Sequence, residues 1–160
     1  MIRWAVWFFA ALPLLLADAW LSRTLWPVPV LTLGFCLFCA LFARTGAVPG
    51  LLVCVALARS VLGGGDAAVH VLVLGMPIAV LLPLRVLFSA SHTLWQCAAA
   101  GFLAFALPKL SGLFARVLDS LPPPAPLDGT QVLWAVLLVP PASWLLQRLP
   151  PLAAFREAAS

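Results

Sequence analysis

Long apolar runs recur from one end of this 160-residue chain to the other, and they constrain its fold more than any other feature. Hydrophobic residues make up 64% of the chain and charged residues only 9%, whereas a soluble domain carries about 25% charged residues. Too few polar side chains are present to cover a water-soluble globule, so lipid must surround most of the surface. The sequence therefore predicts an all-α, polytopic membrane protein.

Six apolar runs have about the length of 17 residues or more that a membrane-spanning helix needs. All belong to a single transmembrane domain, 1–160, and the expected spans are about 4–21, 25–42, 47–62, 67–84, 94–113 and 132–149. Most connections are short, which makes consecutive helices antiparallel neighbours in a compact bundle of six helices. The one substantial loop, 119–129, is rich in proline and is expected to be extended.

Glycine and proline mark local features within this plan. Three glycines at 63–65 predict the turn after the third span, because glycine resists helix and permits positive φ. Asp66 then stands where its carboxylate can cap the fourth helix. Pro140 and Pro141 fall near the middle of the last span, where we expect a kink. Two half-helices, a construction found at some substrate sites, are the alternative.

The orientation of the bundle is predicted from the distribution of Lys and Arg, which are more frequent on the cytoplasmic side of a membrane. A cytoplasmic N-terminus and six spans place more of them inside than outside. The inner set is Arg3, Arg44, Arg85, Arg148 and Arg156, and the outer set is Arg23, Arg59, Lys109 and Arg116. We therefore expect both termini in the cytoplasm. An alternative is that 1–19 form a cleaved signal peptide, but the aromatic residues crowded into the first nine positions argue against it.

Side chains that could carry out chemistry do not converge in the sequence. Cys36 and Cys39 have redox spacing, but they lie in an apolar run, where a thiolate is costly and packing is the favoured role. His70 and His92 are far from the cysteines and from each other, so no zinc site can be assembled. No known catalytic or phosphate-binding motif occurs, and the basic residues form no stripe for nucleic acid. We expect no catalytic residue, no cofactor and no nucleic-acid partner.

Ionisable residues within spans are candidates for function, because a charge in hydrocarbon is costly. One hypothesis is an outward-facing polar cluster; the favoured one is that the same residues serve as helix caps and snorkelling cations. The residues concerned are Asp18, Arg23, Arg59, Asp66 and His70. Small residues form a second candidate, a helix-packing face that receives a partner helix or is internal to the bundle. They are Gly34, Ala98, Ala99, Ala100, Gly101 and Ala104.

The order of the glycine- and proline-containing segments in the middle of the chain resembles that of a known family. The second span is entered through Trp26-Pro27-Val28-Pro29, glycines open the third span in Arg44-Thr45-Gly46-Ala47-Val48-Pro49-Gly50, and Leu62-Gly63-Gly64-Gly65 precedes a further apolar span at Val69-His70-Val71-Leu72. Over about residues 26–88 this resembles the rod-shape-determining MreD family, whose members are similar in length. One departure is Arg59, near a position where many members have aspartate.

The resemblance implies a non-enzymatic component of the bacterial inner membrane that takes part in cell elongation and peptidoglycan synthesis. The implied partners are a bitopic protein of the MreC type and other proteins of the elongation complex. MreD proteins are similar in fold to the six-helix substrate-binding subunits of energy-coupling-factor transporters. That similarity gives the alternative function, a membrane-embedded subunit that binds a vitamin-type molecule in its outward polar cluster.

Overall fold

The computed structural model describes residues 2–24, 28–63, 65–87, 93–118 and 128–155. These residues form α-helices and one short 3-10 helix, and this part of the chain contains no strand, which confirms the all-α prediction. The elements are α1 (Ile2–Thr24), α2 (Val30–Leu41), η1 (Thr45–Ala47), α3 (Val48–Gly63), α4 (Ala67–Leu87), α5 (Thr93–Leu118), α6 (Gly129–Arg148) and α7 (Pro150–Ala153).

Five segments are long and apolar enough to cross a membrane, so the chain is a multi-pass membrane protein. They are Trp4–Ser22, Thr45–Leu62, Ala67–Arg85, Thr93–Val117 and Gly129–Arg148. Each coincides with one of the predicted spans, although α5 continues to Leu118, beyond the expected end. Of the predicted proline-rich loop, 119–127 lies outside the described residues and Gly129 already begins α6.

The second predicted span, 25–42, is wrong in its extent. The helix α2 has only 12 residues, Val30–Leu41, or about 18 Å at 1.5 Å per residue, whereas the hydrocarbon core is about 30 Å thick. Residues 25–27 lie outside the described residues, and Pro29 directly precedes the helix. A residue before proline disfavours the helical conformation, and proline donates no hydrogen bond. The apolar run therefore begins earlier in the sequence than the helix, which begins at Val30.

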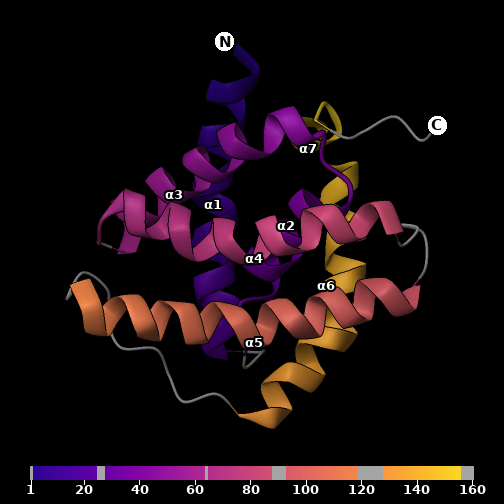
Figure 1. The fold of residues 1–160 in the computed structure, drawn as a ribbon. Coiled ribbons are helices and arrows are strands. Elements are labelled where there is room, and N and C mark those ends of the chain that lie inside the picture. Colours follow the sequence, from indigo (N-terminus) through magenta and orange to yellow (C-terminus); the bar gives the residue numbers. More distant parts are fainter. Residues whose placement is uncertain (1, 25–27, 64, 88–92, 119–127, 156–160) are drawn as a thin grey trace.

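Helix α2 forms the centre of the bundle. Figure 1 shows α3, α4 and α5 side by side in one layer, with α1 and α6 crossing behind them and α2 between. Every residue of α2 except Leu31 is buried. The helix packs most extensively on α6 and also contacts α4, α5 and α1. A helix that is apolar on all sides and enclosed by others is a core element rather than a lipid-facing one.

The two ends of the described chain meet at one end of the bundle. The rings of Trp4, on α1, and Phe155, after α7, lie 4.7 Å apart between centroids. The backbone N–H of Arg44 donates to the Phe155 carbonyl oxygen at 3.0 Å, which brings the connection between α2 and α3 to the same place. We call this the terminal end, defined by Trp4, Arg44 and Phe155. Helix α3 leads from the Arg44 connection to Gly63, and α6 leads from Gly129 towards Phe155. The far ends of these two helices, marked by Gly65 and Asp128, therefore lie away from the terminal end, and we call them the distal end.

Two predictions about glycine and proline are resolved by the backbone. Gly65 has φ of 89°, as expected for the turn after α3. Helix α6 runs unbroken through Pro140 and Pro141, so the two half-helices are not observed. The Ser143 hydroxyl, buried in the same stretch, donates to the Pro140 carbonyl oxygen at 2.8 Å. This hydrogen bond lies within α6. The carbonyl groups that Pro140 and Pro141 leave without a helical N–H partner are those four residues earlier, at Val136 and Leu137.

Candidate functional site

The Asp18 carboxylate of α1 is buried against the first turn of α2, with 3% of the residue exposed. One oxygen, Oδ1, accepts from the backbone N–H of Leu31 at 2.8 Å. The other, Oδ2, accepts from the backbone N–H of Thr32 at 3.0 Å and from its hydroxyl at 2.5 Å. A carboxylate from one helix thus caps the beginning of another.

The composition of the start of α2 explains why this cap comes from elsewhere. The first amides of any helix have no partner within the helix. Here the N-cap residue is Pro29, which makes no side-chain hydrogen bond to the helix. Since Thr32 is buried, water does not replace the missing acceptor. A negative charge is also favoured beside the positive end of the helix dipole, so Asp18 both satisfies the amides and complements the dipole.

Arg85 of α4 acts at the other end of α2. Its Nη1 donates to the carbonyl oxygen of Ala43 at 2.8 Å, just beyond the last turn of α2. Helix C-terminal carbonyls lack partners and carry partial negative charge, which a guanidinium complements. We call Asp18, Thr32, Ala43 and Arg85 the α2 clamp. Opposite charges from α1 and α4 therefore fix a central helix at both of its ends.

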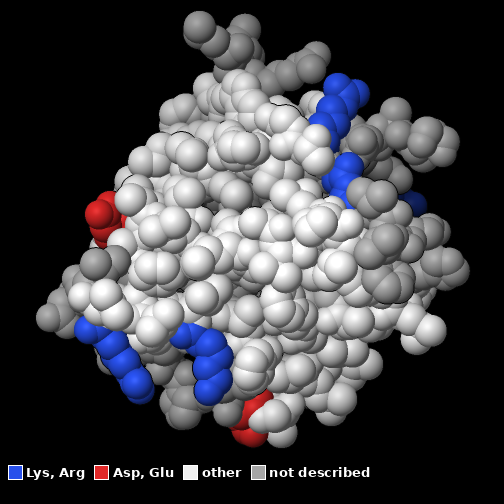
Figure 2. Space-filling model, viewed as in Figure 1, with Lys and Arg blue, Asp and Glu red and all other residues white. Residues whose placement is uncertain are grey.

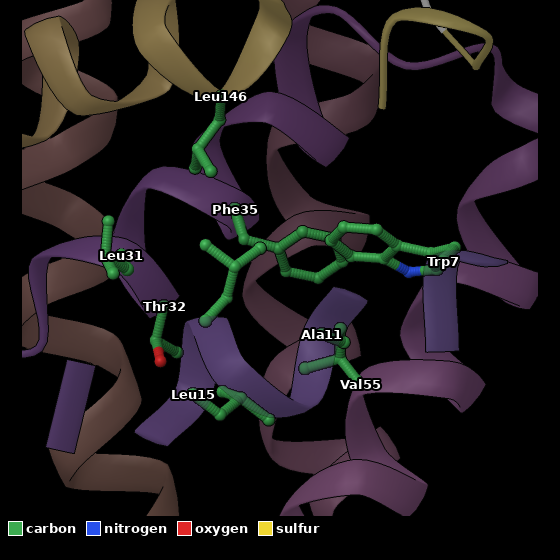
Figure 3. A pocket seen from close by; sticks show the side chains of 9 residues that line it. Trp7, Ala11, Leu15, Leu31, Thr32, Phe35, Val55 and Leu146 are labelled. Carbon is green, nitrogen blue, oxygen red and sulfur yellow. The ribbon is translucent and has the colours of Figure 1, made fainter. Parts of the chain in front are cut away.

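A small cavity lies beside the start of α2 (Figure 3). Its volume is about 20 Å³, room for roughly one water molecule. The Trp7 ring stacks on Phe35 in its wall, with centroids 5.5 Å apart and planes at 19°. The Trp7 Nε1 is buried and has no hydrogen-bond acceptor in the structure. The lining residues are Trp7, Ala11, Leu14, Leu15, Leu31, Thr32, Phe35, Val55 and Leu146.

The two acids of the predicted polar cluster serve different helices. Asp18 caps α2 from a buried position, whereas Asp66 is exposed and its Oδ1 accepts from the Ala68 N–H at 3.0 Å, at the start of α4. This confirms the expected cap at Asp66. The hydrogen bonds of both acids agree with the favoured hypothesis of caps.

The basic and imidazole members of the predicted cluster are placed as follows. Arg59 is half-buried on α3. His70 is half-buried on α4, and its backbone N–H donates to the Asp66 carbonyl oxygen at 3.1 Å. The side chain of Arg23 lies outside the described part of the chain. The structure thus links His70 to Asp66 through the backbone at the start of α4.

The small-residue face lies mostly inside the bundle. Gly34 permits the close approach of α2 to α6, since a Cβ there would lie 3.2 Å from Leu146 Cδ1. Gly101 faces α6 similarly, with Val136 Cγ2 at 3.2 Å from the same imagined atom. Three of the alanines, Ala99, Ala100 and Ala104, are buried, and Ala98 is exposed. Of the two interpretations left open by the sequence, these contacts agree with internal packing.

The described residues present no cluster suited to metal binding. No group of three or more His, Cys, Asp or Glu in that part of the chain could hold a metal ion. Cys36 and Cys39 are free and fully buried in α2, which agrees with the packing role expected for them.

Sequence reasoning singled out Asp18 but missed its partners Thr32 and Leu31, and it missed the contact between Arg85 and Ala43. One signal was available: an apolar run that opens with Pro29 offers no cap of its own, and buried helix starts require one. The nearest acid in the sequence is Asp18.

Comparison with known proteins identifies no relative, because the chain matches no protein-family model, no curated protein and no solved structure. The fold and the α2 clamp therefore stand on this chain's own residues, and they describe an all-helical, multi-pass membrane protein organised around a short buried helix.

Proposed function

We propose that this chain is a non-enzymatic scaffold of the bacterial inner membrane that takes part in rod-shaped cell elongation by binding an MreC-type partner. The observation that supports a scaffold is the use of the buried carboxylate. Asp18 has all its described hydrogen bonds directed to the start of α2, so it braces the fold instead of facing a passage or a substrate. The choice of machinery rests on the resemblance over residues 26–88.

The proposal includes six membrane crossings, with α2 as the short central one. The contact between Trp4 and Phe155 brings the start of α1 and the end of the chain to the same end of the bundle. A chain that returns to its starting side crosses an even number of times, and the five long segments alone give an odd number. Counting α2 makes six. The protein surrounding α2 shields a helix that is too short to span lipid alone. The α2 clamp pairs the amides of Leu31 and Thr32 at its start and the Ala43 carbonyl just beyond its end.

Both termini are assigned to the cytoplasm in this proposal. Among the described residues, the terminal end carries Arg44, which bonds Phe155, and Arg85, which bonds Ala43 next to it. The described acids Asp66 and Asp128 lie at the distal end. Over the whole sequence, five Lys and Arg are assigned to this end and four to the other, namely Arg23, Arg59, Lys109 and Arg116. Because cationic residues are retained preferentially on the cytoplasmic side, the terminal end is assigned as the inner one.

The alternative, a vitamin-binding transporter subunit, receives less support from the cavity beside Thr32. Its volume of about 20 Å³ is far below the roughly 300 Å³ or more of a typical small-molecule site. Its lining contains Thr32 and the Trp7 indole as polar groups, and no charged side chain. The cavity therefore matches a packing gap between α1, α2, α3 and α6 better than a ligand pocket.

The test is affinity purification of the tagged, full-length protein from detergent-solubilised membranes, followed by mass spectrometry. The proposal predicts recovery of a single-span protein together with enzymes of wall synthesis, and rounding of rod-shaped cells on depletion. Co-purification of a nucleotide-hydrolysing coupling module with a bound small molecule, and normal rods after complete depletion, would instead support the transporter function.

A further inference from the structure

We propose that the terminal end of the bundle binds the phosphate of anionic phospholipid headgroups through Arg44 and Arg148. The inference concerns a lipid site and does not depend on which protein partner the scaffold takes. It rests on three observations: the position of the arginines at one end of the bundle, the exposed tryptophan beneath Arg148, and the segregation of the acids.

The arginines lie at the same end of the bundle, where residues 149–155 connect them. Arg148 ends α6, and the residues that follow form α7 and lead to Phe155. The Phe155 carbonyl oxygen accepts from the Arg44 N–H at 3.0 Å. The Arg85 guanidinium bonds the adjacent Ala43 at 2.8 Å and adds a third positive charge to the same region. Arg44 and Arg148 are both exposed, so their guanidinium groups are accessible to a ligand.

The surroundings of Arg148 place it at the level of lipid headgroups. Its guanidinium carbon lies 3.6 Å from the centre of the Trp144 ring. Trp144 is 54% exposed, and Leu145 beside it is 57% exposed, so this side of α6 faces outward. Tryptophan concentrates where hydrocarbon gives way to headgroups. The Arg148 side chain runs back along α6 by one turn to reach this ring. An exposed guanidinium at this level is available to phosphate, which its planar fork can bind with two hydrogen bonds.

Charge segregation favours an anionic lipid over a zwitterionic one. Figure 2 shows a broad uncharged face with charged side chains gathered at its margins, and the upper right margin carries Lys and Arg without any Asp or Glu among the described residues. The described acids Asp66 and Asp128 lie at the distal end, with Asp18 buried nearby against α2. A zwitterionic headgroup brings its own cation to such a surface, whereas an anionic one does not.

The test uses the purified full-length protein in neutral detergent with added phosphatidylglycerol or phosphatidylcholine, and native mass spectrometry to count retained lipids. The wild type is expected to retain several-fold more phosphatidylglycerol than phosphatidylcholine. In the double variant Arg44→Gln/Arg148→Gln this preference is expected to fall to about one. The matched control, Lys109→Gln/Arg116→Gln, removes the same charge from exposed positions of α5 and is expected to keep the wild-type preference.

Three results would overturn the proposal: an unchanged preference in Arg44→Gln/Arg148→Gln, an equal loss in the control, or displacement of the lipid by millimolar inorganic phosphate, which would assign the site to a soluble anion. If the double variant fails to fold, Arg148→Lys serves instead. It keeps the charge but not the planar fork, and it should retain part of the preference; full retention would remove the role given to the guanidinium.

Discussion

Asp18 and Thr32 are joined twice, because one carboxylate oxygen of Asp18 accepts from both the backbone N–H and the hydroxyl of Thr32, at 3.0 and 2.5 Å. This pair ties α1 to the beginning of the most deeply buried helix. The pair gives the buried amides of Leu31 and Thr32 an acceptor at the start of a 12-residue helix, and Arg85 bonds the Ala43 carbonyl just beyond the other end.

Replacing Asp18 by alanine is expected to destabilise the protein by about 3 kcal/mol, because two buried amides and a hydroxyl lose a charged acceptor. Asp18→Asn retains one carbonyl oxygen and is expected to lose less. The control is Asp66→Ala, which removes an exposed cap from α4 at a cost of about 1 kcal/mol. Unfolding in detergent, followed by circular dichroism, measures all three. Equal losses in Asp18→Ala and Asp66→Ala would contradict the α2 clamp.

The Thr32 hydroxyl can be tested separately from its backbone. Thr32→Val keeps the shape of the side chain and the amide bond to Asp18, but it removes the 2.5 Å hydroxyl bond. We expect a loss of about 1.5 to 3 kcal/mol, typical of a hydrogen bond to a charged group, and near wild-type stability in Thr32→Ser. In the Asp18→Ala background, Thr32→Val should cost little more, since the bond is already gone. If the losses of unfolding free energy in the two single variants simply add in the double variant, the Thr32 hydroxyl does not stabilise the protein through Asp18.

Arg85→Met is expected to destabilise the protein by about 1 to 3 kcal/mol, because the Ala43 carbonyl loses a charged donor. Methionine preserves much of the apolar stem, which isolates the contribution of the guanidinium. Arg116→Met, at an exposed position of α5, provides the comparison and should change the melting temperature little. A melting temperature for Arg85→Met that matches that of Arg116→Met would remove Arg85 from the α2 clamp.

Gly50 tests the contact between the two ends of the chain. A Cβ there would lie 2.5 Å from Trp4 Cη2, and the Trp4 ring contacts Phe155. Gly50→Ala should therefore displace the indole and cost about 1 to 3 kcal/mol, as overpacking does. Gly46→Ala is the matched control, since a Cβ at Gly46 meets nothing within 4 Å. Thermal unfolding of both variants checks the prediction, which fails if Gly50→Ala is as stable as Gly46→Ala.

The sequence predicts the long helices well because one property, the length of an apolar run, decides whether a segment can span lipid. It does not predict the extent of α2, since the apolar run continues through Pro29 while the helix starts after it. There, backbone conformation outweighs hydropathy. The cap at Asp66 can be predicted from the sequence, because Asp66 directly precedes the helix that it caps.

The partners of Asp18 and Arg85 could not be predicted in the same way. Asp18 bonds Thr32 on another helix, 14 residues further along, and Arg85 bonds Ala43, 42 residues away. Such pairs depend on how the helices pack, and a single sequence does not specify this. The small-residue stretch at 98–104 is similar: its composition predicts close packing, but only the fold assigns most of it to the interior.

The claim that α2 is a sixth crossing is tested most directly by comparing two cysteines on either side of the pair α1 and α2. In a chain whose four natural cysteines are replaced by alanine, one cysteine is added ahead of Ile2 and another replaces Gly46, where a side chain has open space. A membrane-impermeant maleimide is applied to sealed vesicles of known orientation. If α2 crosses the membrane, both cysteines are labelled from the same side, the cytoplasmic one. Labelling from opposite sides would mean that α2 does not cross the membrane, and would contradict it.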